Sequence, residues 1–131
     1  MTGCHVQPEQ MFDLIWGYNA GYAERVSNLN AANGGNILSS TIVPTGEVWV
    51  ACSLVAFNDS RNPTTIFLGL DDRTTWYNLT RKAGAGVGLS TEWSGMAVAP
   101  AGSRFYAYIT GCVAGDHIYL EIVGYKMKLT Q

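Results

Sequence analysis

The chain has 131 residues, of which 47% are hydrophobic and only 14% are charged, with a net charge of −2. Its eight basic residues are scattered, which argues against nucleic-acid binding, since a phosphate-binding surface needs clustered Lys and Arg. Soluble domains usually carry roughly 25% charged residues. The low charge therefore favours a subunit of an assembly, and the length suits one domain with a core of its own.

The first ten residues lack a basic stretch followed by an apolar core, so we expect no signal peptide. No run approaches the roughly 18 apolar residues of a membrane span, so we expect no membrane contact and folding in a cytoplasm. The three cysteines, Cys4, Cys52 and Cys112, form no Cys-x-x-Cys pair. Cys52 and Cys112 are expected to be small buried side chains, with a cross-sheet disulfide between them as the alternative.

Residues 1–34 are expected to form an N-terminal arm, partly helical, in front of a sandwich domain at residues 35–131. Apolar side chains recur within residues 9–32 at the three- and four-residue steps of an amphipathic helix; they are Met11, Ile15, Tyr18, Tyr22, Val26 and Leu29. Gly17 and Gly21 each weaken a helix by roughly 1 kcal/mol, so this helix would need a partner surface. That surface is either the domain's own sheet or a neighbouring copy. In the alternative, residues 9–20 are extended and only residues 20–30 are helical.

Short apolar runs separated by turn residues fill the rest of the chain. They lie at residues 37–43, 47–57, 64–70, 74–79, 93–98, 102–113 and 117–128. The run at 47–57 is apolar on both faces, which is typical of a central strand. Seven or eight strands with turn signals between them predict an antiparallel β-sandwich or jelly roll.

The last two runs are predicted to pair as a hairpin around Gly115 and Asp116. Aliphatic residues alternate with aromatic ones in both runs, so one face would be buried and the other rich in tyrosine. The tyrosines of that face are Tyr106, Tyr108, Tyr119 and Tyr125. Tyrosine buries area while keeping a polar tip, so this face is predicted to be a protein contact surface, with plain sheet packing or a ligand platform as alternatives.

No catalytic motif is present. The two histidines, His5 and His117, have no evident nucleophile and acid beside them, and Asp59, Asp71 and Asp72 lack a calcium-loop signature. The glycine-rich run 82–90 lacks the Gly-Lys-Ser/Thr ending of a phosphate loop. We therefore expect no enzyme, no cofactor and no metal. Trp76 and Trp93 are the candidate ligand-facing aromatics if the chain binds a sugar.

Three segments carry a family resemblance: Val-Pro-Thr-Gly-Glu-Val-Trp-Val at 43–50, Pro-Ala-Gly-Ser-Arg-Phe at 100–105, and Ala-Gly-Asp-His-Ile-Tyr-Leu-Glu-Ile-Val-Gly-Tyr at 114–125. Together they resemble small β-sandwich structural proteins of tailed-bacteriophage virions, such as capsid decoration or cement proteins and fibre modules. The likeness is one of strand pattern and covers roughly residues 40–128. It implies a non-enzymatic virion component, often arranged as a trimer or other ring, and it brings no catalytic residues.

These observations together predict a capsid decoration or cement subunit that assembles in the host cytoplasm and resides in the virion. Its partners would be other virion proteins and its own copies, with a trimer favoured. The predicted assembly interface consists of Met11, Phe12, Ile15, Trp16, Tyr18, Tyr22, Tyr106, Tyr108, Tyr119 and Tyr125. The alternative is a receptor- or carbohydrate-binding module of a phage tail or fibre, in which Trp76 and Trp93 would face solvent.

Overall fold

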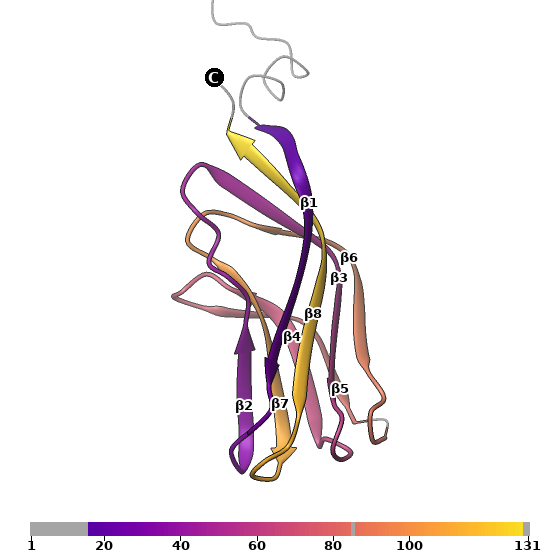
Figure 1. Cartoon of the computed structure of the whole chain (residues 1–131). Helices are drawn as coiled ribbons and strands as arrows, with labels where there is room; N and C mark the ends of the chain where they lie inside the picture. Colours follow the sequence, from indigo (N-terminus) through magenta and orange to yellow (C-terminus); the bar gives the residue numbers. More distant parts are fainter. Residues whose placement is uncertain (1–15, 85, 130–131) are drawn as a thin grey trace, which may run out of the picture.

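The computed structural model describes residues 16–84 and 86–129, which form eight β-strands (Figure 1). The strands are β1 (Trp16–Asn28), β2 (Gly34–Ser39), β3 (Glu47–Asn58), β4 (Thr65–Asp71), β5 (Trp76–Ala83), β6 (Thr91–Ala99), β7 (Arg104–Cys112) and β8 (Ile118–Leu129). Sheet one has the order β1-β8-β3-β6 and sheet two the order β2-β7-β4-β5. Successive strands change sheet at every step except β4 to β5. This is a jelly-roll β-sandwich, and it confirms the predicted fold class.

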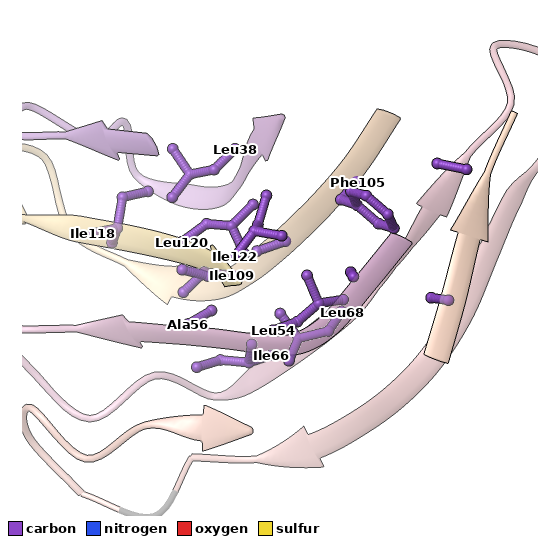
Figure 2. Close-up of a cluster of buried hydrophobic side chains, with 14 of the residues drawn as sticks. Leu38, Leu54, Ala56, Ile66, Leu68, Phe105, Ile109, Ile118, Leu120 and Ile122 are labelled. Atoms are coloured by element: carbon purple, nitrogen blue, oxygen red, sulfur yellow. The ribbon is translucent and has the colours of Figure 1, made fainter. Parts of the chain in front are cut away.

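The core lies between the two sheets, where inward side chains of both layers meet (Figure 2). Every second residue of a strand points to the same face, and in most strands that inward position is aliphatic. The fully buried apolar side chains include Leu54, Ala56, Ile66, Leu68, Phe105, Ala107, Ile109, Ile118, Leu120 and Ile122. The core constrains only the inward side chains of each sheet. A functional surface is therefore to be looked for among the outward side chains on the two outer faces.

The predicted N-terminal helix is wrong for the residues that the structure describes. Residues 16–28 form β1, which pairs with β8 from Trp16 opposite Leu129 to Asn28 opposite Ile118. Tyr22 and Val26 stand four residues apart, and a four-residue step satisfies both the helical period and the alternation of a strand. Residues 16–34 therefore belong to the sandwich and not to a separate arm. The rest of the predicted arm, residues 1–15, lies outside the described residues.

The predicted hairpin of the last two strands is also wrong. β7 lies between β2 and β4 in sheet two, whereas β8 lies between β1 and β3 in sheet one. The two strands face each other across the core, so their aliphatic sides meet while their aromatic sides point in opposite directions. The predicted tyrosine face is consequently divided: Tyr106 and Tyr108 belong to sheet two, and Tyr119 and Tyr125 to sheet one.

Candidate functional site: two outer sheet faces

An open groove runs over the outer face of sheet two. Its lining comes from all four strands of that sheet and consists of Ile37, Phe67, Trp76, Asn78, Tyr106 and Tyr108. We call this set the aromatic groove; its volume is about 270 Å³. Four of its six side chains are aromatic, so the groove offers ring faces and edges in place of the charged groups usual on a solvated sheet.

The rings of the aromatic groove hold one another in place. The Trp76 and Tyr106 rings meet edge to face with centroids 4.8 Å apart, and the Phe67 and Tyr108 centroids are 5.6 Å apart. The Tyr106 hydroxyl donates a hydrogen bond to Oδ1 of Asn78. Aromatic pairs at such distances contribute about 0.5–1.5 kcal/mol beyond area burial, so the groove is formed before any ligand arrives.

Gly69 of β4 makes room for the Tyr106 ring. A Cβ at this position would lie 2.9 Å from the ring and 1.9 Å from the backbone oxygen of Tyr77. The ring therefore lies flat over β4 and is only 3% exposed although it points outward from the sheet. Burial, together with the nearby Asp71 carboxylate, raises the pKa of Tyr106, so its hydroxyl remains a hydrogen-bond donor at neutral pH.

Charged side chains flank the groove. The Arg81 guanidinium lies 5.1 Å from the Phe67 ring centroid, a cation–π distance. Beside Trp76, Nε of Arg104 lies 3.0 Å from Oδ2 of Asp71, so this carboxylate is neutralised. Within residues 16–84 and 86–129, Arg81 has no ion pair with a carboxylate. The groove is thus flanked by one paired and one unpaired arginine.

The outer face of sheet one is apolar over the half where β1 begins and β8 ends. Gly21, Tyr125, Val50 and Val98 are direct partners in one row across all four strands. We call the outward apolar side chains of this region the apolar half-face: Tyr18, Met96, Val98, Val123, Tyr125 and Met127. Four of them are more than half exposed, with Tyr18 at 72%, Met96 at 67%, Val123 at 56% and Val98 at 51%. Contiguous exposed apolar surface of this kind is typical of a contact site.

The other half of the same face is polar. Nε of Arg25 on β1 lies 3.1 Å from Oε2 of Glu121 on β8, and the Arg25 guanidinium lies 4.4 Å from the Tyr119 ring centroid. Tyr119 stacks on Phe57 of β3 with centroids 4.9 Å apart. These residues contact one another within the sheet, whereas the side chains of the apolar half-face, apart from the Tyr18–Tyr125 ring contact at 6.4 Å, mostly face solvent.

A buried polar cluster fixes the loops at one end of the sandwich. Oδ2 of Asp116 accepts hydrogen bonds from Nε of Arg61 at 2.6 Å, from the Val113 amide at 2.9 Å and from Nδ2 of Asn58 at 3.0 Å. The Arg61 bond, helped by the other two donors, lowers the pKa of Asp116 well below its usual range. The backbone of Asp116 also accepts a hydrogen bond from the Ala31 amide at 3.1 Å. The cluster ties three loops together and is structural.

The structure separates the residues that the sequence had grouped as one interface. Tyr18 is exposed on the apolar half-face, but Tyr22 belongs to the core and its hydroxyl donates to Oε1 of Glu24 at 2.8 Å. Of the candidate ligand-facing aromatics, Trp76 is 46% exposed in the groove, whereas Trp93 packs against the core. Trp16 opens β1, and Met11, Phe12 and Ile15 lie outside the described residues.

Sequence reasoning missed the other residues of the two surfaces. Phe67 had a detectable signal, because the aliphatic Ile66 and Leu68 on either side of it suit the inward face and alternation then turns Phe67 outward. The same argument applies to Ile37 beside the buried Leu38. Met96 and Val98 had no comparable signal, since β6 mixes small, polar and apolar residues on both sides.

Other candidate chemistry finds no support within the described residues. No group of three or more His, Cys, Asp or Glu side chains there is placed to hold a metal ion. Cys52 and Cys112 are both free thiols, and burial raises the pKa of Cys112. His117 is exposed in the loop before β8, while His5 lies outside the described range. No helix in that range is long and apolar enough to cross a membrane.

Comparison with known proteins supports the fold. No family model matches the sequence, and neither does any curated protein. A chain from the acid-stable capsid of Helicobacter pylori bacteriophage KHP30 is similar with a TM-score of 0.55, covering 84% of this chain and 90% of that one at 11% identity. A carbohydrate-binding module of the β-sandwich superfamily gives a TM-score of 0.43, with 86% and 57% covered at 9% identity. Another such module, CBM4, gives 0.40, with 88% and 80% covered at 13% identity. The TM-score of 0.55 with the capsid chain shows a shared β-sandwich fold, and an identity of 11% shows no more than the fold.

Proposed function

We propose that this protein is a non-enzymatic structural subunit of a virion, of the capsid decoration or cement kind. In this proposal it docks on neighbouring copies through the apolar half-face of sheet one, with a trimer as the favoured assembly. The observation that carries the proposal is the exposure of this half-face in a chain with few charges. The jelly-roll likeness to a phage capsid chain over 90% of that chain's length supports the same reading.

The energetics favour a covered half-face. Burying a Val, Met or Tyr side chain contributes roughly 1.5–3 kcal/mol, and Tyr18, Met96, Val98 and Val123 each leave at least half of their surface in water. Interfaces also favour aromatic residues and methionine at their centres and exclude charge from them. The nearest ion pair on this face, Arg25 with Glu121, lies in its other half, where it would form part of a polar rim.

The test is the mass of the full chain in solution by light scattering. We expect an assembly of about three times the 14.2 kDa chain mass, converted to monomer by Val98→Asp, since a buried unpaired carboxylate is strongly unfavourable. Leu89→Asp is the matched control, because Leu89 is also exposed but lies in a loop away from the half-face. A wild-type chain that stays monomeric at high concentration would refute self-association through this surface.

A further inference from the structure

The aromatic groove of sheet two lies on the layer opposite the apolar half-face, so the proposed assembly surface leaves it unexplained. We propose that the groove binds an acidic saccharide, with a pyranose ring stacked on its aromatic floor and a carboxylate at Arg81. This proposal goes beyond the structural role and does not depend on it.

The groove has the size and rigidity of a site for a single sugar ring. Its volume of about 270 Å³ is just below the roughly 300–1,000 Å³ of pockets for drug-sized ligands. Trp76, Tyr106 and Asn78 brace one another through the edge-to-face contact and the hydroxyl-to-amide hydrogen bond. Because the floor is already ordered, binding would cost little side-chain entropy.

The polar atoms left over in the groove are hydrogen-bond donors. Oδ1 of Asn78 is occupied by the Tyr106 hydroxyl, so its amide offers Nδ2–H. The indole of Trp76 is a donor only, and the Tyr108 hydroxyl can donate. None of these three donors has a hydrogen-bond partner among residues 16–84 and 86–129. A lining of donors selects a ligand rich in acceptors.

The charge beside the groove selects an anion. Arg81 lies against Phe67 with no carboxylate partner within the described residues, while Arg104 already neutralises Asp71. A guanidinium is planar and binds a carboxylate through two parallel hydrogen bonds. Arg81 therefore complements a carboxylate carried by a ligand that lies over the Phe67 end of the groove.

A saccharide fits this set better than a peptide does. The aromatic floor suits a compact ring better than an extended peptide backbone, and because the groove is open, the O–H groups of a bound sugar that need acceptors can face water. The hydroxyl and ring oxygens of a pyranose accept hydrogen bonds, and its C–H faces pack on aromatic rings. A uronic or sialic acid adds the carboxylate that Arg81 requires.

The experiment is a titration of the full chain followed by NMR shifts of the Trp76 indole N–H and by calorimetry. The probes are tetragalacturonate, tetraglucuronate and sialyllactose. Methyl-esterified tetragalacturonate is the ligand control, because it differs from the acid only in its charge. We expect at least one acid to bind in the millimolar range or tighter, about ten-fold more tightly than its neutral counterpart.

Three variants separate the contributions. Trp76→Ala is expected to lower the affinity about ten-fold, since stacking on one aromatic ring contributes on the order of 1–3 kcal/mol to related base stacking. Arg81→Gln is expected to remove the preference for the acid over the ester while retaining the weaker binding. Tyr119→Ala is the matched control, because Tyr119 is an aromatic of the opposite sheet that belongs neither to the groove nor to the apolar half-face, and this variant is expected to bind like the wild type.

Several outcomes would overturn the proposal. The first is no shift of the Trp76 indole with any of the three acids at about 10 mM. The second is equal affinity for acid and ester in the wild type, and the third is an equal loss of affinity in Trp76→Ala and in the control Tyr119→Ala. Binding of a hexaglutamate peptide in the groove with no binding of the saccharides would also overturn it, in favour of a peptide partner. The oligomer mass bears on none of these readouts, so the two proposals fail separately.

Discussion

The Asp116 cluster provides a direct test of how the loops are held. The change is Asp116→Ala, which removes the acceptor of three hydrogen bonds but leaves the donors in place. Asn58 is fully buried, so its Nδ2 would lose its only oxygen acceptor without access to water and keep just the weak contact with Sγ of Cys112 at 3.8 Å. The Val113 amide is partly buried and would lose a partner as well. The side chain of Arg61 is 41% exposed and can return to solvent.

The magnitude follows from the two donors that stay inside the protein. Leaving a buried donor without a partner costs about 1–3 kcal/mol. With roughly 2 kcal/mol for Asn58 and roughly 1 kcal/mol for Val113, the variant should lose about 3 kcal/mol of unfolding free energy. For a domain of this size that lowers the Tm by roughly 10 °C. The assay is thermal unfolding by circular dichroism at pH 7, with Asp59→Ala, an exposed acid in the neighbouring loop, as the control.

The effect should also depend on pH in a defined direction. The Arg61 bond lowers the pKa of Asp116 in the folded state, and an unfolded Asp titrates near 3.9. A lowered folded pKa gives a stabilisation that is fully present above the unfolded pKa and is lost as the pH falls below it. The difference in Tm between wild type and Asp116→Ala should therefore be largest above about pH 5 and shrink below about pH 4. An equal difference at pH 3 and pH 7, or no loss at pH 7, would refute this reasoning.

Three further substitutions probe the rest of the sandwich. Gly69→Ala should lose about 1–3 kcal/mol by overpacking and displace Tyr106, so urea unfolding and the groove's NMR signals should both change; an unperturbed Tyr106 would contradict the contact. Arg73→Gly should gain about 0.5–1 kcal/mol in the same urea assay, because Arg73 has a φ of +75°. Glu24→Gln weakens the hydrogen bonds that Glu24 accepts from the amide and hydroxyl of Thr41, so hydrogen exchange of the Thr41 amide should accelerate. An unchanged exchange rate would show that other contacts protect the Thr41 amide.

The fold class could be predicted because alternation and turns are local signals. The aliphatic alternation of Ile118, Leu120 and Ile122 identified the inward side of β8 correctly. Alternation does not show which strand lies next to which. β7 and β8 carry the same pattern, and this pattern fits two strands paired in one sheet as well as two strands facing each other across the core. Both strands were therefore located correctly, but their predicted pairing as a hairpin was wrong.

A local irregularity in β3 was also beyond the reach of the sequence pattern. In β3 the pairing shifts between Ala51 and Ser53, so Cys52 forms a bulge. Trp49, Ala51 and Leu54 therefore all point into the core. Simple alternation would have placed Trp49 and Ala51 on one face of β3 and Leu54 on the other. When both faces of a strand are apolar, as here, nothing in the sequence indicates where such an extra residue sits.

The candidate site was predictable only in part, because it depends on which strands become neighbours. Trp76 was identified from its type alone, but Tyr106, Phe67 and Asn78 join it only through the order β7-β4-β5 of sheet two. The tyrosines of β7 and β8 were predicted to form one surface, but the two strands belong to different sheets and their tyrosines therefore lie on opposite outer faces. Residue type thus indicated which side chains were available for contact, and topology decided which of them meet.

The division of the two surfaces between two layers has a consequence for how they can work together. The groove and the apolar half-face belong to different sheets with the whole core between them, so covering one leaves the other open to solvent (Figure 1). Sites so separated, with no shared side chain, should contribute additively. If both proposals hold, Val98→Asp should dissociate the assembly into monomers without weakening saccharide binding. Trp76→Ala should weaken saccharide binding and leave the assembly intact. Coupling between the two would mean that the groove is completed by a neighbouring copy and that assembly itself forms the binding site.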